Sequence, residues 1–230
     1  MVGPMPVDPK QFWESKILSW EQGRYGRPDR PMGLVEWIAD RSSMSLRFRV
    51  AAIPELLRPF LANKRVIELG CGSGLLAGKL VEYGAASYLG IDIAESAIEK
   101  ARQSYRGNDR IEFLVSDIED IQKISADLVI SLGLFDWLTD QEMSSVFRKS
   151  GASNFLHAIA ERRPGFQQWL HRCYVQLAYG YRTGSYRPRY LTCDHIRSLA
   201  TTGPRPLYVY RNWRLSFGAL ISSLPIGEVM

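Results

Sequence analysis

A glutamate and three alternating glycines are the residues of this sequence whose types and spacing best fit a chemical role. Glu68 precedes Gly70, Gly72 and Gly74 at the point where a short apolar stretch gives way to a helical pattern. Glycines at such a turn let the backbone approach a ligand closely, and the first N–H groups of the following helix are free to bind it. The sequence therefore predicts a ligand-binding loop between a strand and a helix.

Spacing and charge distinguish between two cofactors that bind loops of this kind. A dinucleotide loop follows the pattern G-x-G-x-x-G/A, and from Gly70 its third small residue would fall where the sequence has Leu75. A carboxylate at Glu68 would repel a pyrophosphate, but it would attract a cofactor that carries an ammonium and a sulfonium group. Both observations favour S-adenosylmethionine over NAD.

Two further acids fall where a nucleoside would be bound. Asp92 follows a second apolar stretch, 18 residues after Gly74, and an acid there can accept both ribose hydroxyls. Asp117 ends a third such stretch and is expected to accept the adenine amino group, with Ile118 beside the ring. Ligands of doubly wound sheets lie at the carboxyl ends of the strands, where these acids are placed. The other expected cofactor contacts are Cys71, Ile93 and Leu132.

The elements that must position these residues alternate along the middle of the chain. Strand and helix patterns follow one another, which predicts βαβ units and a mostly parallel, doubly wound sheet. The expected strands are 65–69, 87–93, 111–117, 126–133 and 154–161, and the expected helices are 73–83, 94–105 and one that a capping box opens at Thr139 and Glu142. Two later strands, 206–212 and 216–224, predict an antiparallel hairpin that makes the sheet mixed.

At these residues the chain resembles the class I S-adenosylmethionine-dependent methyltransferases. The first motif of that family, an acid followed by G-x-G-x-G, matches 68–74, and its acids after strands two and three match Asp92 and Asp117. Its fourth motif is similar to 126–133, so the resemblance covers 63–163. It implies an α/β fold with a doubly wound, mostly parallel, seven-stranded sheet, an antiparallel C-terminal hairpin and helices on both faces. It also implies methyl transfer from a sulfonium to a nucleophile.

Segments outside this core are expected to cover it. Residues 1–62 predict a helical cap, within which 20–26 would close over the cofactor as a lid, and 63–230 form the Rossmann-like domain. In similar methyltransferases, insertions between strands five and six shape the acceptor pocket. The corresponding stretch here is about 164–203.

The acceptor should meet the methyl group above the carboxyl ends of strands four and five. After strand four, Asp136 could act as a general base and Trp137 as a wall of the pocket, the alternative being a loop acid and a core tryptophan. Glu161 and Arg162, after strand five, are placed to face the site, and His195 opens a helix beside a Tyr/Arg-rich loop. The catalytic candidates are therefore Asp136, Glu161 and His195. Mid-strand His157 is expected to be a buried, hydrogen-bonded side chain.

The sequence after strand four also bears on the atom that is methylated. Family members that methylate amino groups of bases or amides carry an asparagine-proline-proline-tyrosine type of fourth motif, which this sequence lacks. Its absence argues against methylation of a nucleic-acid base.

The Tyr/Arg-rich loop, 179–190, is the second expected acceptor region. Tyrosine and arginine together can stack on flat or sugar rings and bind anionic groups, and a solvated connector is the alternative. Residues 141–230 hold 12 Lys/Arg against 4 Asp/Glu, a net charge of +8 that fits an anion site or a solvated basic face. The residues expected to bind the acceptor are Trp137, Arg162, Arg182, Tyr186, Arg189 and Tyr190.

Composition narrows the class of protein. No apolar run approaches the roughly 18 residues of a membrane span, and the start of the chain lacks the basic and apolar regions of a secretory signal. Cys71, Cys173 and Cys193 are odd in number and contain no CxxC pair, so we expect free thiols, no metal site and a reducing cytoplasm.

Together these observations predict a cytoplasmic enzyme that uses S-adenosylmethionine to methylate a hydroxyl of a small, anionic or sugar-containing molecule. One alternative is a non-catalytic S-adenosylmethionine-binding module that docks on RNA or an anionic membrane through the basic half of the chain. Another is an NAD-dependent oxidoreductase. Nucleic acid is not the expected acceptor, while peripheral membrane contact and the oligomeric state stay open.

Overall fold

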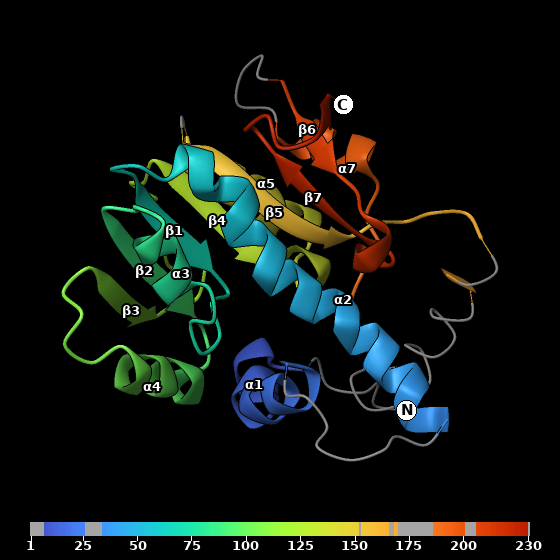
Figure 1. Cartoon of the computed structure of the whole chain (residues 1–230), viewed down its shortest axis with the longest axis horizontal. Helices are drawn as coiled ribbons and strands as arrows, with labels where there is room; N and C mark the ends of the chain where they lie inside the picture. Colours follow the sequence, from blue (N-terminus) through green and yellow to red (C-terminus); the bar gives the residue numbers. More distant parts are fainter. Residues whose placement is uncertain are drawn as a thin grey trace, which may run out of the picture.

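A computed structural model describes residues 7–25, 34–151, 153–165, 168–169, 186–200 and 206–229, and describes 24–25 and 34–43 by their backbone alone. Its centre is a single sheet with helices on both sides (Figure 1). Most of the expected acceptor insertion, about 164–203, lies outside the described residues.

Eight strands form the sheet, in the order β3-β2-β1-β4-β5-β7-β6-β8. The first five in this order pair in parallel, and β7, β6 and β8 run antiparallel to their neighbours. The strands are β1 Arg65–Leu69, β2 Ser87–Asp92, β3 Ile111–Val115, β4 Leu128–Leu132, β5 Asn154–Ala160, β6 Tyr208–Tyr210, β7 Gly218–Ser222 and β8 Glu228–Val229.

The predicted mostly parallel, doubly wound sheet with a C-terminal hairpin is confirmed. The eighth strand, which adds to the seven expected, is the short β8 at the edge beside β6. Two residues are too short to give the alternating pattern from which strands are predicted. Several predicted strands also extend up to two residues beyond the observed ends, for example 206–212 against Tyr208–Tyr210.

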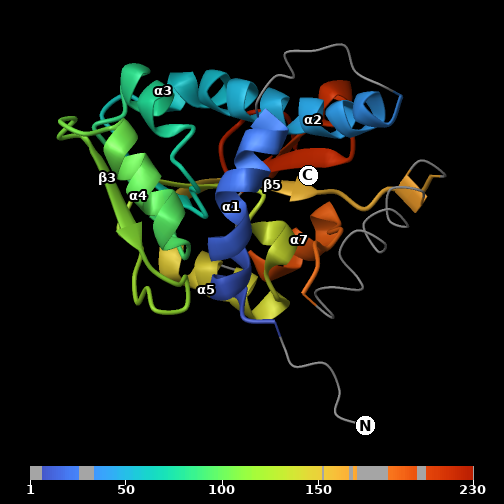
Figure 2. The ribbon, with the colours of Figure 1, turned by 90° about the horizontal axis from the view of Figure 1, so that it is seen from below.

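Helices cover both faces of the sheet (Figure 2). On the face covered by α2, α3 and α4, Ile53, Leu80 and Ile98 belong to the same apolar core as Leu156 of β5. On the other face, α5 and α7 contribute to a second core. The helices are α1 Pro9–Tyr25, α2 Leu34–Leu57, α3 Ala77–Glu82, α4 Glu95–Ser104, α5 Asp140–Ser150 and α7 Cys193–Leu199. The capping box predicted at Thr139 and Glu142 is present at the start of α5.

Helix α2 continues through an internal proline. Pro54 lies inside the helix, between Ile53 and Leu57, which are 1% and 0% exposed. An internal proline costs roughly 3 kcal/mol or more, whereas burying two large aliphatic side chains contributes roughly 1.5–3 kcal/mol each. The apolar packing on either side of the proline is therefore sufficient to keep the helix continuous.

Helix α1 lies across the carboxyl ends of the strands (Figure 2). Its Ile17 packs against Ala94 and Ala97, which follow β2, and the Glu14 carboxylate accepts from the amide of Ser96 at 3.2 Å. The helix extends to Tyr25, so most of the predicted lid segment, 20–26, is helical. Its placement sets the N-terminal segment over the edge of the sheet where the candidate ligand residues lie.

Candidate functional site

The glycine loop after β1 is fastened to the end of β2. The amides of Gly70 and Cys71 donate to the carbonyl of Ile91 at 2.8 and 3.1 Å. Cys71 is buried, and burial raises the pKa of its thiol. These contacts fix the loop against the neighbouring strand at the carboxyl edge of the sheet.

Positive φ angles run through this loop. Gly70, Gly72 and Gly74 have φ values of 68°, 53° and 76°, which side-chain-bearing residues rarely adopt. A Cβ atom at Gly74 would also meet the ring of Phe113 at 2.7 Å. Because left-handed turns reach position 74, α3 begins only at Ala77, later than the predicted helix start at 73.

Asp92 holds the loop from the end of β2. One carboxylate oxygen accepts from the amide of Gly72 at 2.8 Å, and the other accepts from the amide of Ala94 at 2.9 Å. Burial raises the pKa of this carboxyl group, and the two amides oppose the rise. The predicted ribose ligand is therefore at the glycine loop, close to where the nucleoside of a bound cofactor is expected.

Glu68 lies beneath the loop and is only 2% exposed. The hydroxyl of Tyr88 donates to its carboxyl group at 2.5 Å. Burial raises the pKa of Glu68 to about 8; the Tyr88 hydrogen bond opposes this rise, and the negative charges of Asp92 and Glu21 add to it. Without a nearby cation, Glu68 is therefore mostly protonated at neutral pH, a state that its position in the sequence did not indicate.

A third carboxyl group, from α1, was missed by the sequence analysis. The side chain of Glu21 is 6% exposed, and its Oε1 accepts from the amide of Ser73 at 2.9 Å. Its Oε2 is buried and has no hydrogen-bond partner. The residue lies within the predicted lid segment, but no local motif distinguishes it in the sequence from a glutamate on the exposed face of a helix.

The remaining candidate cofactor residues follow β2 and β3 or end β4. Asp117 is half-buried, and its Oδ1 accepts from the amide of Glu119 at 2.9 Å. Ile118 packs against the core under α5 and α7, and Leu132 packs against the core under α2 and α3. Ile93 is also half-buried. All of these residues lie at the same edge of the sheet as the glycine loop.

The electrostatics of this edge fit a cationic ligand. Glu21, Glu68 and Asp92 are buried together, and none of the charged groups that affect the pKa of Glu68 is a cation. The unpartnered Oε2 of Glu21 adds an orphaned acceptor. Buried charges and acceptors are costly unless they are paired, so an ammonium- and sulfonium-bearing cofactor suits this edge and a pyrophosphate does not.

Four aromatic rings meet beside these acids. Trp137, which follows β4, lies 4.9 Å from Trp13 and 5.1 Å from Tyr186 between ring centroids, and Phe12 lies 5.6 Å from Trp137. The indole N–H of Trp13 donates to the hydroxyl of Tyr186 at 2.8 Å. Two expected acceptor residues, Trp137 and Tyr186, are thus brought together. Phe12 and Trp13 of α1 complete the cluster, and the sequence did not predict that they would lie there.

Asp136 is buried next to this cluster. Its Oδ1 accepts from the amide of Ala160 at 2.6 Å, which joins the segment after β4 to the end of β5. Burial raises the pKa of Asp136 to about 6, and the positive charge of Arg49 and the Ala160 amide oppose the rise. Arg49 of α2 is itself buried, its Nε has no hydrogen-bond partner, and its guanidinium lies close against Gly218.

Glu161 has a different environment from the one expected. It forms ion pairs with Arg163, at 2.5 Å, and with Arg211, at 2.7 Å. Burial opposes its ionisation, but the hydrogen bonds from Arg211 and Arg163 outweigh that effect and lower its pKa. The structure therefore places Glu161 in a network that ties β5 to the chain after β6.

Arg189 and His195 share one carboxylate. The guanidinium of Arg189 contacts Asp140 at 2.6 Å and also donates to the carbonyl of Leu138, while His195 Nε2 lies 3.0 Å from Asp140. These contacts lower the pKa of Asp140. Arg189 is thus engaged in holding its loop, although the sequence suggested that it binds the acceptor.

Three other residues were expected to bind the acceptor. Arg162 has an exposed side chain, and its amide donates to the carbonyl of Leu191. Tyr190 is half-buried. Arg182 lies outside the described residues.

His157 is a buried core residue, as predicted. Its Nδ1 lies 2.9 Å from the hydroxyl of Ser131, and its ring stacks on Phe135. Burial lowers its pKa to about 3, so the ring is neutral at physiological pH.

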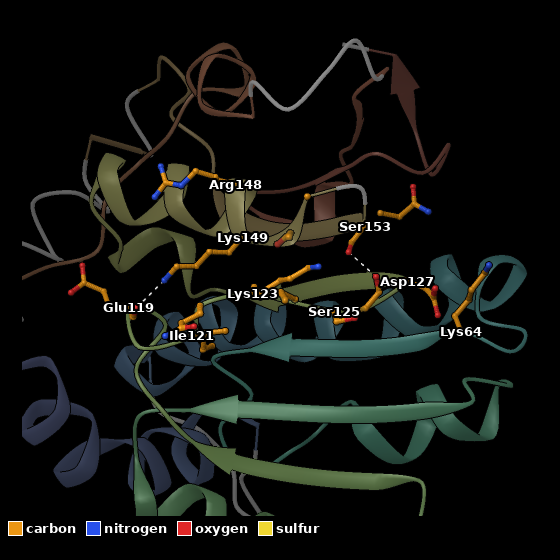
Figure 3. Close-up of a pocket in the computed structure, with 15 residues that line it drawn as sticks. Lys64, Glu119, Ile121, Lys123, Ser125, Asp127, Arg148, Lys149 and Ser153 are labelled. Atoms are coloured by element: carbon orange, nitrogen blue, oxygen red, sulfur yellow. Dashed lines mark hydrogen bonds between the residues drawn. The ribbon is translucent and has the colours of Figure 1, made fainter.

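A hollow of about 1020 Å³ lies at the opposite edge of the sheet (Figure 3). Its lining includes Lys64, before β1, Asp127, before β4, and Ser153, before β5. Lys149 at its rim donates to the carbonyls of Ile118 and Glu119. Because ligands of doubly wound sheets bind at the carboxyl ends of the strands, this hollow is not where the candidate site lies.

Comparison with known proteins identifies the domain. Residues 66–152 match a family described as a methyltransferase domain. The matched segment contains the glycine loop, Asp92, Asp117 and Asp136. Residues 66–152 of the chain therefore carry a methyltransferase domain.

Solved structures share the fold at low sequence identity. The chain is similar to magnesium protoporphyrin IX methyltransferase from Synechocystis PCC 6803 with bound SAH, at a TM-score of 0.69, 17% identity and coverage of 93% of this chain and 96% of that one. It is also similar to human N-acetylserotonin methyltransferase in complex with SAM, at a TM-score of 0.57, 16% identity and coverage of 95% and 67%.

Curated relatives match over shorter segments. A ribosomal protein L11 methyltransferase from Enterobacter is 44% identical over 31% of this chain and 25% of its own length. A malonyl-[acyl-carrier protein] O-methyltransferase from Anoxybacillus flavithermus is 41% identical over 46% of this chain and 47% of its own length. The chain thus spans between a quarter and a half of these relatives, and their names include different acceptors.

No helix within the described ranges is long and apolar enough to cross a membrane. The same residues contain no group of three or more His, Cys, Asp or Glu side chains arranged to hold a metal ion.

Proposed function

We propose that this protein methylates an oxygen of a small acceptor that is anionic or contains a sugar, with Asp136 as the base. The observation that carries the proposal is the position of Asp136 after β4, buried beside Trp137 and Tyr186 and joined to the end of β5. This is the region of the sheet edge where the acceptor of a class I domain is expected.

The chemistry required of the protein is modest. S-adenosylmethionine supplies a methyl group on a good leaving group, so the protein has mainly to align the acceptor oxygen with it and exclude water. An alcohol or acid proton must leave as the oxygen attacks. A carboxyl group with a pKa of about 6 is mostly ionised at neutral pH and can take that proton.

The aromatic cluster and nearby arginines support the class of acceptor. Trp137 and Tyr186 offer ring faces and edges for a flat or sugar ring. The buried guanidinium of Arg49 supplies positive charge beside Asp136, and Arg162 is exposed at the end of β5. O-methylation is also part of the names of two kinds of relative, the malonyl-[acyl-carrier protein] and ubiquinone biosynthesis O-methyltransferases.

The proposal includes a division of the chain into functional segments. Residues 1–62 would form the cap, 63–230 the catalytic domain and about 164–203 the acceptor region. A cytoplasmic location fits the free thiols of Cys71 and Cys193.

Incubation of the protein with S-adenosylmethionine carrying a ¹³C-labelled methyl group, together with fractionated cell extract, tests the proposal. Carbon chemical shifts of the labelled product distinguish a methyl group on oxygen from one on nitrogen or carbon. A small product with an O-methyl signal is expected. A label on nitrogen, or on RNA or protein alone, would contradict the proposed acceptor while leaving the cofactor assignment intact.

A further inference from the structure

Within the part of the chain that the structure describes, Glu21 is one of three residues with a buried side-chain atom that has no hydrogen-bond partner. It comes from α1, which lies outside the sheet and contacts the end of the glycine loop through Glu21. Its Oε1 is used by the amide of Ser73, while its Oε2 is buried without a partner. An unsatisfied buried acceptor is costly, so its retention needs a compensating ligand or a functional reason.

The surroundings of Glu21 show what kind of ligand would satisfy it. Its charge acts on both Glu68 and Asp92, and it raises the pKa of each. Three carboxyl groups therefore share one poorly hydrated region at the loop. A hydroxyl or amide donor would satisfy one oxygen but would leave the excess negative charge, whereas an ammonium group supplies both donors and charge.

The Glu21 carboxylate comes as close to the loop as it does because position 72 is a glycine. Glu21 Oε1 lies in the space that a Cβ atom at Gly72 would occupy, and Gly72 has a φ of 53°. Glycine at this position thus permits the close approach of the α1 carboxylate to the loop. The contact between α1 and the loop is specific in geometry as well as in charge.

We propose that Glu21 binds the ammonium group of the amino-acid part of S-adenosylmethionine, with Oε1 remaining on the Ser73 amide and Oε2 accepting from the ammonium. Glu21 thereby couples the position of α1 to the presence of the cofactor. The inference rests on the cofactor assignment and is independent of the acceptor, so it can hold or fail separately from the proposed O-methylation.

Glu21→Gln keeps the shape of the side chain and can keep the hydrogen bond to Ser73, but it removes the charge. Affinities are measured by calorimetry, without acceptor, for S-adenosylmethionine, S-adenosylhomocysteine and 5′-methylthioadenosine, which lacks the amino-acid part. The variant should bind the first two about ten- to a hundredfold more weakly, the range for a hydrogen bond to a charged group. Its affinity for 5′-methylthioadenosine should be unchanged.

Glu14→Gln is the matched control. Glu14 lies on the same helix and also accepts from a backbone amide, that of Ser96, but the residue is exposed. This variant should bind all three ligands as the wild type does. Thermal unfolding of the ligand-free Glu21→Gln variant should show no loss of stability, because the substitution removes a buried negative charge that acts on Asp92.

Three results would overturn the proposal. Equal weakening of all three ligands would mean that Glu21 only shapes the loop. Weakening for S-adenosylmethionine alone would mean that it interacts with the sulfonium. Unchanged affinity for every ligand would mean that the cofactor does not contact it.

Discussion

At the scale of single residues, the site combines acids whose protonation states differ because their surroundings differ. Glu68 has no cation among the groups that affect its pKa, and burial dominates. Asp136 is equally buried but feels the charge of Arg49, so its pKa is raised less, to about 6. Glu161 is paired with two arginines, and its pKa is lowered. Three carboxyl groups at one edge of a sheet are thereby suited to different tasks.

Glu68 predicts a pH dependence of cofactor binding. In the folded, ligand-free protein its pKa is about 8 rather than 4.5, so it binds a proton that the unfolded chain has lost. Stability of the free protein should therefore decrease as pH rises from about 4.5 towards 8. A bound cation favours the carboxylate, so S-adenosylmethionine affinity should rise with pH over the same interval.

Calorimetry between about pH 6 and 8 measures this effect, and the logarithm of the affinity should rise by up to about one unit per pH unit. Glu68→Gln should remove most of the slope. A wild-type affinity independent of pH would show that Glu68 keeps its proton when the cofactor binds.

Asp136 predicts which variant loses catalysis. Asp136→Asn should reduce kcat by about a hundredfold or more with cofactor affinity retained. In the wild type, kcat/KM should fall as pH decreases through about 6, because the protonated carboxyl group cannot accept a proton. A wild-type rate for Asp136→Asn at every pH would assign catalysis to proximity alone or to His195.

Glu161→Gln should instead lower the Tm, since it leaves Arg163 and Arg211 without their shared partner.

At the scale of elements, the account depends on how α1 meets the glycine loop. Gly72→Ala would place a Cβ atom against the Glu21 carboxylate at a φ of 53°. This variant should weaken S-adenosylmethionine binding at least tenfold, because either the loop or α1 must move. Gly107→Ala is the control: Gly107 has a φ of 86°, but a Cβ atom there would meet nothing within 4 Å, so the substitution introduces backbone strain alone. Gly107→Ala should lose roughly 1–2 kcal/mol of stability from the backbone strain alone. Gly72→Ala should lose more because of the added clash, and only Gly72→Ala should lose affinity.

The hydrogen bond between Trp13 of α1 and Tyr186, in the expected acceptor region, should affect acceptor binding. Trp13→Phe removes the indole N–H that donates to the Tyr186 hydroxyl and keeps an aromatic ring. A hydrogen bond contributes about 0.5–1.5 kcal/mol net, so the acceptor's KM should rise about two- to tenfold while S-adenosylmethionine affinity stays constant. Trp213→Phe, at a side chain that is 77% exposed, serves as the control. An unchanged KM for Trp13→Phe would separate the aromatic cluster from acceptor binding.

Local sequence patterns predicted the helices, the strands and the cofactor loop. The features that they did not predict depend on how the helices pack on the sheet. Glycines at strand-to-helix turns and acids at strand ends are adjacent in sequence to the elements that position them, so Glu68, Gly70 and Asp92 could be identified directly. Glu21 and Arg49 reach the site only because α1 and α2 fold over the sheet, and no local spacing indicates that. The helix through Pro54 likewise follows from burial of Ile53 and Leu57 rather than from propensity.

For the residues expected to bind the acceptor, the sequence predicted the kind of side chain but not its partners. Trp137 and Tyr186 were expected near the acceptor, and their rings do meet, 5.1 Å apart. Arg189 and Glu161 carried the right chemistry, but each forms ion pairs with residues distant in sequence, Asp140 and Arg211 respectively. The sequence shows which side chains are charged, but the tertiary structure determines which residue each of them pairs with.

At the scale of the whole molecule, the sheet, the loop and the N-terminal helix form one edge that fits a cationic nucleoside cofactor. Binding of S-adenosylmethionine, measured by calorimetry against NAD as the competing ligand, tests this most directly. The wild type should bind S-adenosylmethionine in the micromolar range, roughly −8 kcal/mol, and should not bind NAD. Asp92→Ala should weaken that binding about ten- to a hundredfold through lost hydrogen bonds. Binding of NAD without binding of S-adenosylmethionine would contradict the account.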